Sequence, residues 1–186
     1  MPLPPPTVAR TLVHTRRVRF EGYKRADGLW DIEAHLTDIK PTDYRLASGV
    51  RPAGLPVHDM WVRLTIDREL RIVDALAITD AMPYPPYCAV VNPDYRKLIG
   101  LELARGFRKA VHDRFHDVAG CTHINELLAQ FPSAAVQIMA GDKVDNASEG
   151  GRKPFQLDRC MALDTTGEGV REFYPRWYRS TQEEVG

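Results

Sequence analysis

Residues 29–39 constrain the fold most, because apolar and polar side chains alternate along the whole segment. Trp30, Ile32, Ala34 and Leu36 fall on one side, and the intervening positions hold polar residues, namely Asp31, Glu33, His35 and Thr37. This period of two is typical of a β-strand with one buried and one solvent-facing side. Residues 13–23 alternate at Val18 and Phe20, and Asp27-Gly28 lies between the two segments. Asp-Gly is a strong turn signal, so the sequence predicts a β-hairpin here.

The rest of the first 140 residues predicts two more strands followed by helices. Residues 40–56 contain three prolines and two glycines and favour a long loop of the kind that often covers a site. Residues 57–67 and 71–80 favour strands, and we expect the second of these to be central and buried on both faces. Helical spacing or helix-start signals follow at residues 92–99, 106–116, 123–130 and 133–140.

Strands first and helices afterwards indicate an α+β fold, an antiparallel sheet of four or more strands with helices packed on one face. We expect three parts along the chain. Residues 1–12 form a proline-rich arm, residues 13–140 a single α+β domain, and residues 141–186 a polar linker with an aromatic C-terminal arm. We expect a homodimer, because an aromatic arm of this kind is difficult for a small domain to bury alone.

The composition excludes several classes of function. The 25 basic residues balance 25 acidic ones, so no strong field attracts nucleic acid or an anionic membrane. No apolar run reaches the roughly 18 residues of a membrane span, and the N-terminus does not resemble a signal peptide. Three cysteines in unrelated contexts favour reduced thiols. We therefore expect a cytoplasmic protein that meets neither nucleic acid nor membrane.

The densest group of reactive side chains lies in residues 118–128, where a loop with Gly120 meets the start of a helix that Thr122 can cap. Cys121 at that position could be a nucleophile, a metal ligand or a reactive thiol, or simply a small buried residue. His123 could transfer protons at neutral pH. Glu126, three residues later on the same helical face, either orients His123 or stabilises the helix start.

A second group lies on and after the predicted third strand. His58 shares the apolar face with Met60, Val62 and Leu64, which makes it either a catalytic group at the edge of the core or a core histidine. Asp59 is expected to pair with Arg63. Asp80 ends the fourth strand and needs a partner, for which His58 or Arg63 is available. The remaining candidates are two tyrosines of the proline-rich segment and three residues for substrate binding, namely Tyr84, Tyr87, Trp61, Arg63 and Trp30.

Four motifs in order resemble one known family. They are Asp-Gly-Leu-Trp-Asp-Ile-Glu at 27–33, Pro-Val-His-Asp-Met-Trp at 56–61, Ile-Gly-Leu at 99–101 and Ala-Gly-Cys-Thr-His at 119–123. The chain is identified on these motifs as a member of the bacterial family called domain of unknown function 2889, over roughly residues 13–140. The resemblance implies an accessory protein of a catabolic gene cluster, including clusters for aromatic compounds. The strand order and the Gly-Cys at a helix start are also similar to iron–sulfur scaffold proteins, but the contexts of Cys88 and Cys160 do not fit that class.

These observations lead to one main hypothesis and two alternatives. The main one is an enzyme without a cofactor, a lyase or isomerase that uses acid–base chemistry on an aromatic, possibly lignin-derived, small molecule. His58 or His123 would be the base, Tyr84, Tyr87 or Cys121 the acid, and Asp80 or Glu126 the orienting carboxylate. No dinucleotide fingerprint, phosphate loop or serine-hydrolase elbow is present. The alternatives are a protein that binds zinc or iron through Cys121 and His123, and an oligomeric interaction module without catalysis.

Overall fold

The fold is described from a computed structural model, which covers residues 3–140, 151, 153–154 and 156–180. The chain separates into two compact units, Met1–Ile138 and Met139–Gly186. Each unit is described by itself. Within the described residues, no helix is long and apolar enough to cross a membrane.

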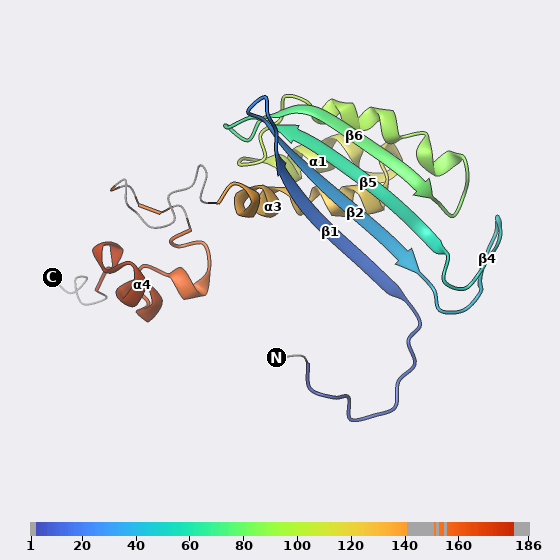
Figure 1. Cartoon of the computed structure of the whole chain (residues 1–186), viewed down its shortest axis with the longest axis horizontal. Helices are drawn as coiled ribbons and strands as arrows, with labels where there is room; N and C mark the ends of the chain where they lie inside the picture. Colours follow the sequence, from blue (N-terminus) through green and yellow to red (C-terminus); the bar gives the residue numbers. More distant parts are fainter. Residues whose placement is uncertain (1–2, 141–150, 152, 155, 181–186) are drawn as a thin grey trace. The chain divides into compact units, whose positions relative to one another are not determined.

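The first unit is built on a four-stranded antiparallel sheet with the strand order β1-β2-β5-β6 (Figure 1). Its strands are β1 (Thr15–Lys24), β2 (Trp30–Ile39), β5 (Pro56–Ile66) and β6 (Ile72–Ala81). β1 and β2 form the predicted hairpin, and Gly28 takes a positive φ of 84° in its turn. The α+β class and the antiparallel sheet predicted from the sequence are thus confirmed.

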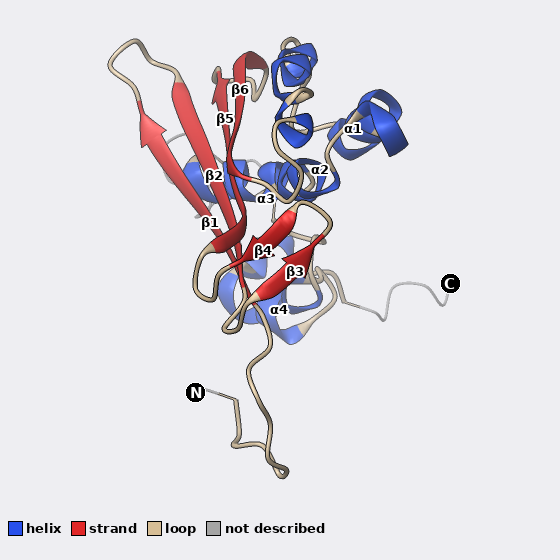
Figure 2. Cartoon of the chain, turned by 90° about the vertical axis from the view of Figure 1, so that its right-hand side faces the viewer, coloured by secondary structure: helices blue, strands red, loops and turns tan. Residues whose placement is uncertain are grey.

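Helices lie on one face of the sheet (Figure 2). These are α1 (Phe107–Phe115), α2 (Thr122–Leu128) and α3 (Phe131–Ile138), with the 3₁₀ helices η1 (Tyr87–Ala89), η2 (Asn92–Leu98) and η3 (Asp117–Ala119). α2 contacts β2 and β5, whereas α3 contacts β1 and β2. The core between these layers holds the alternating residues of the sheet, among them Ile32, Ala34, Leu36, Met60, Val62 and Leu64. We call this side of the sheet the inner face and the opposite side the outer face.

Two predictions about the strands were wrong. Residues 40–56 are not simply a loop, because they contain a short hairpin of β3 (Tyr44–Leu46) and β4 (Gly49–Arg51). β6 is an edge strand rather than a central one, and its alanines face the core while Leu76 and Ile78 face outward and are about two-fifths exposed. A shift of register between Thr65 and Ile66 lies at the start of the β5–β6 pairing, so Ile72 is buried although Leu76 is not.

The second unit contains η4 (Met161–Leu163), α4 (Glu168–Phe173) and η5 (Pro175–Trp177). Asp158 organises it by accepting hydrogen bonds from the backbone N–H and the hydroxyl of Thr165, at 2.9 and 2.8 Å, and by pairing with Lys153. Phe173 of the predicted aromatic arm is exposed. Phe155 and most of the predicted polar linker lie outside the described residues.

Close packing of α3 on β1 depends on Gly22. A Cβ atom at this position would lie 2.3 to 2.7 Å from three side-chain carbons of Ile138, which real contacts essentially never show. We expect Gly22→Ala to lower the free energy of unfolding by about 1–3 kcal/mol, as over-packing does. Urea unfolding measures this. In an Ile138→Ala background the same change should be much less destabilising, and equal losses in both backgrounds would contradict this explanation.

Candidate active site

A buried carboxylate, Asp38, is the centre of the site. It is the last inward-facing residue of β2, is only 2% exposed, and lies opposite Arg16 of β1 and His58 of β5 in the strand pairing. Both of its oxygens are used. Oδ1 accepts from Nε of Arg16 at 2.8 Å and lies 2.9 Å from Nε2 of His14, while Oδ2 accepts from Nη2 of Arg16 at 2.8 Å and lies 2.9 Å from Nδ1 of His58. One cross-strand row therefore joins three strands through a single side chain.

The charge on Asp38 is fixed by its neighbours. Burial by itself raises the pKa of Asp38, but the hydrogen bonds and positive charge of Arg16, together with His58, outweigh burial and lower this pKa from 3.8 to about 2. The carboxylate is therefore ionised at neutral pH and can only accept hydrogen bonds. The proton in its hydrogen bond with His58 must then sit on Nδ1 of the imidazole, which leaves Nε2 of His58 with a free lone pair.

His123 of α2 lies directly beside His58. The centroids of the two rings are 3.9 Å apart, the ring planes are tilted by 34°, and Nε2 of His123 is 3.9 Å from Oδ2 of Asp38. Burial lowers the pKa of His58 below 6.5, and His123 lowers it further; burial and then the charge of Arg16 lower the pKa of His123. Both imidazoles are therefore mainly neutral at pH 7. Their side chains are 14% and 26% exposed, so both rings are partly in contact with solvent.

Local packing holds the start of α2 over the sheet. Ile124, Leu127 and Leu128 are buried and anchor the helix. The hydroxyl of Tyr95 accepts from the backbone N–H of Cys121 at 2.8 Å and donates to Oδ1 of Asn125 at 3.0 Å. A Cβ at Gly120 would lie 2.4 Å from the carbonyl oxygen of Phe115, so this tight approach requires glycine.

Two predictions about this loop need correction. Cys121, not Thr122, is the N-cap residue of α2, and its side chain makes no capping hydrogen bond. Glu126 does not orient His123 by a hydrogen bond. Its Oε2 accepts from Nη1 of Arg16 at 2.6 Å instead, which ties α2 to β1.

Asp38, His58 and His123 also have the composition of a metal site. One ligand atom from each of Asp38, His58 and His123 lies within 4.8 Å of the other two, and Cys121 is not part of this group in the described chain. Two imidazoles and one carboxylate are a common ligand set for iron and zinc. A metal would have to replace at least one hydrogen bond of Asp38, because all four lone-pair positions of this carboxylate already have donors.

Comparison with known proteins gives the family and no activity. The model of a protein family of unknown function, DUF2889, matches residues 14–137, which is more than half of the chain. The chain belongs to this family. The resemblance predicted from the four motifs is therefore confirmed. No match is found among curated proteins or among solved structures.

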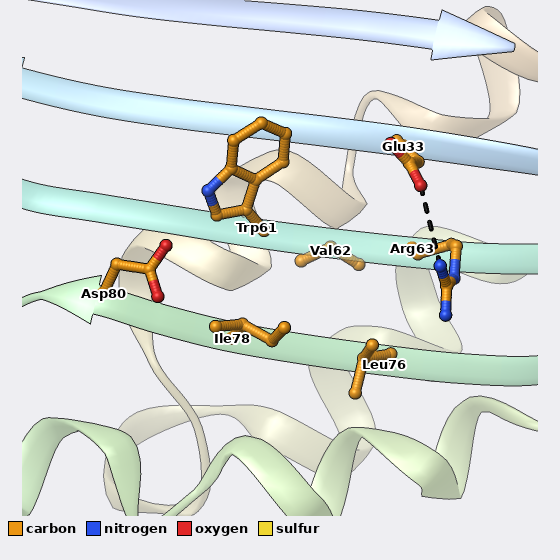
Figure 3. A pocket seen from close by; sticks show the side chains of 7 residues that line it. All are labelled: Glu33, Trp61, Val62, Arg63, Leu76, Ile78 and Asp80. Carbon is orange, nitrogen blue, oxygen red and sulfur yellow. Dashed lines mark ion pairs between the residues drawn. The ribbon is translucent and has the colours of Figure 1, made fainter.

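The DUF2889 fold brings His58 of β5 and His123 of α2 together but separates them from other predicted site residues. Asp80, Trp61 and Arg63 lie on the outer face, where they line a pocket, so Asp80 cannot orient His58 (Figure 3). Arg63 is 3.7 Å from Glu33, and Asp59 pairs with His35 at 2.7 Å, so the predicted pair between Asp59 and Arg63 is wrong.

Three aromatic residues predicted for the site are also placed apart from the histidines. Trp30 is buried at the first position of β2, eight residues before Asp38 and therefore roughly 26 Å away along the strand. It belongs to the core. Tyr84 and Tyr87 follow the end of β6 at the same end of the sheet as His58, but both are exposed, Tyr87 to 78%. The hydrogen bonds, ion pairs and ring contacts of the two imidazoles among the described residues involve Asp38 and each other, and neither tyrosine.

The sequence interpretation missed Asp38, Arg16 and His14, although a signal was present. Asp38 continues the apolar side of the alternation that runs from Trp30 to Leu36, and a carboxylate on the apolar side of a strand needs a buried partner. Arg16 lies two positions before Val18 on the corresponding side of β1. Pairing the two strands by their turn would have placed this arginine opposite this aspartate.

The lowered pKa of Asp38 predicts a loss of stability in acid. Because the folded pKa, about 2, is below the usual 3.8, ionised Asp38 stabilises the fold above pH 4, and this contribution disappears as the pH falls towards 2. The difference corresponds to about 2 kcal/mol. Urea unfolding at a series of pH values should show that Asp38→Asn removes this part of the acid sensitivity. The exposed Asp80→Asn variant is the control, and equal acid sensitivity of wild type and Asp38→Asn would contradict the assignment.

Proposed function

We propose that this DUF2889 protein is a small-molecule enzyme that carries out an acid–base step of the lyase or isomerase type, with His58 as the general base. The observation that carries the proposal is the hydrogen bond between Nδ1 of His58 and the buried, ionised Asp38. A carboxylate that orients one nitrogen of an imidazole leaves the other nitrogen available to take a proton. Asp38 thus takes the orienting role that the sequence assigned to Asp80 or Glu126.

His123 supports the same chemistry as the second proton carrier. Its ring lies 3.9 Å from that of His58 and is more exposed, so a substrate on the solvent side meets both imidazoles. In the proposed step, Nε2 of His58 removes a proton from carbon next to an electron-withdrawing group. The electron pair then moves into that group or expels a leaving group, and His123 donates a hydrogen bond or a proton to the charge that forms.

Burial and the charge of Arg16 support this arrangement at neutral pH. Arg16 balances Asp38 through two hydrogen bonds. Burial lowers the pKa values of both histidines, and the charge of Arg16 lowers them further, so the base stays unprotonated near pH 7. For the substrate we retain the proposal of an aromatic or similarly bulky intermediate of catabolism. It rests on the motif resemblance, and the planar, partly exposed ring of His123 offers such a molecule a stacking surface.

Substitution of His58 by asparagine tests the base. The amide nitrogen of Asn can replace Nδ1 as donor to Asp38, so the fold should keep its stability while proton abstraction is lost. We expect turnover to fall by about 10²- to 10⁴-fold. The measurement is NMR of a panel of aromatic acids and ketones in D₂O, which detects both product and exchange of carbon-bound protons.

The matched control is His112→Asn, because His112 lies on the exposed surface of α1. This variant should exchange protons at the wild-type rate, and thermal unfolding should be nearly the same for all three proteins. Full turnover by His58→Asn would refute His58 as the base. Unfolding of His58→Asn would instead assign that histidine a structural role.

A metal centre is the second candidate function, favoured by the short distances within Asp38, His58 and His123. In that case zinc or iron would be bound by these three residues, rather than by Cys121 and His123 as the sequence suggested. Elemental analysis of the untagged protein separates the candidates. A metal centre predicts a stoichiometric ion that is lost in His123→Asn and kept in Cys121→Ala. Acid–base catalysis without metal predicts full turnover after treatment with a chelator.

The homodimer predicted from the aromatic arm also remains a proposal. Sedimentation of the full chain measures it directly, and a monomer at micromolar concentration would refute it.

A further inference from the structure

The outer face of the sheet carries a second, separate arrangement of chemically useful side chains, centred on Trp61. In the strand pairing, Trp61 of β5 lies between His35 of β2 and Ile78 of β6. The indole stacks on the imidazole of His35 with ring centroids 3.7 Å apart and planes at 8°. Asp59 holds this imidazole through a hydrogen bond of 2.7 Å to Nε2. One side of the indole is therefore covered, and its orientation is fixed.

A pocket of about 230 Å³ lies on the β6 side of Trp61. Figure 3 shows Ile78 and Leu76 along one border of this pocket, with Trp61 across from Ile78. Both aliphatic side chains are about two-fifths exposed to water. Exposed apolar side chains that lie together on a protein surface often mark a binding site. An apolar surface beside a fixed indole is suited to a flat, apolar ring.

Charged side chains mark the two ends of the pocket, Arg63 with Glu33 at one end and Asp80 at the other. At one end, Arg63 is paired with Glu33 only at 3.7 Å, and the side chain of Arg63 is 43% exposed, so its guanidinium has donors to offer. At the other end is the exposed carboxylate of Asp80, for which the contacts among the described residues include no ion pair. The strand pairing gives the distance between these two ends. Leu76 lies opposite Arg63 and is four residues from Asp80, so the backbone positions of Arg63 and Asp80 are separated by roughly 13 Å along the strands.

We propose that this pocket binds an elongated aromatic carboxylate with a phenolic hydroxyl at the far end of its ring. The ring lies against Trp61 and Ile78, the carboxylate accepts hydrogen bonds from Arg63, and the phenol donates to Asp80. The span favours a hydroxycinnamate over a benzoate. Because Trp61 and His58 lie on opposite faces of the sheet, this site is distinct from the proposed catalytic one and does not depend on it.

Calorimetric titration of the full-length protein with 4-hydroxycinnamate tests the proposal. We expect a dissociation constant on the order of a millimolar or tighter, as for other ligands of this size. Arg63→Gln should weaken binding about tenfold, because a charge-assisted hydrogen bond is lost. Glu33→Gln should strengthen binding a few-fold, because it removes the carboxylate that competes for Arg63. The uncharged amide of the same ligand should bind about tenfold more weakly to wild type and be insensitive to both changes.

Two variants serve as controls. Arg17→Gln removes a positive charge from the outer face of β1 away from the pocket, and His58→Asn alters the inner face. Both should bind 4-hydroxycinnamate with wild-type affinity. Absence of binding at ten millimolar ligand, on the order of ten times the expected constant, would overturn the proposal. So would weaker binding in His58→Asn together with unchanged binding in Arg63→Gln, since the ligand would then occupy the inner face.

A second copy of the chain is the competing occupant of this surface. Sedimentation of wild type and of Ile78→Asp distinguishes the two, because the changed side chain is exposed and the variant should fold. A dimer that Ile78→Asp dissociates, and that 4-hydroxycinnamate does not affect, would replace the ligand site by a protein interface.

Discussion

The buried carboxylate of Asp38 is the interaction on which the rest of the site depends. Taking an ionised carboxylate out of water costs several kcal/mol unless donors replace the lost hydration. Here the donors come from β1 and β5, so the requirement to satisfy one side chain fixes the relative positions of three strands at this end of the sheet. The same requirement determines which nitrogen of His58 carries the proton. Fold and chemistry are therefore set by a single group.

The strands could be predicted from the sequence because each one carries its own local signal. The alternation of β2 and the Asp-Gly turn specify a hairpin without reference to any other part of the chain, and this prediction is confirmed. β6 shows the limit of such reasoning. Its residues are apolar on both sides, so the pattern does not reveal which side is buried, and the structure buries the alanines and leaves Leu76 and Ile78 exposed. The assignment of Asp80 to the site failed for the same reason.

The site itself could be predicted only in part. His58 and His123 were both expected to be functional, but they are 65 positions apart, and no local pattern states that their rings meet. What brings them together is long-range packing, in which Tyr95 holds the backbone at Cys121 and α2 lies on β2 and β5. Asp38 was overlooked because acidic residues of a strand are usually solvent-facing. Asp38 lies on the apolar side of the alternation in β2. Once β1 is paired with β2 so that Arg16 lies opposite Asp38, this position indicates a buried ion pair.

Arg16 connects the sheet to α2 in addition to pairing with Asp38. Its three side-chain contacts reach a buried carboxylate on β2 and a surface carboxylate, Glu126, on α2, so it joins the sheet to the helix that carries His123. The carboxylate of Asp38 is buried, whereas the carboxylate of Glu126 is largely exposed. The ion pair of Arg16 with Asp38 therefore contributes more to stability than its ion pair with Glu126. Arg16 thereby fixes His58 firmly through Asp38, whereas it restrains His123 only weakly.

The segment matched by the family model begins at residue 14 and ends at residue 137, so it contains both the inner cluster and the outer pocket but none of the second compact unit. The two sites use the same strands. Asp38 and His58 point inward from β2 and β5, while His35 and Trp61 point outward from those strands, and the alternation of side chains that builds the core also separates the sites. The period of two along β2 and β5 thus lets one sheet carry two sites whose side chains lie on opposite faces.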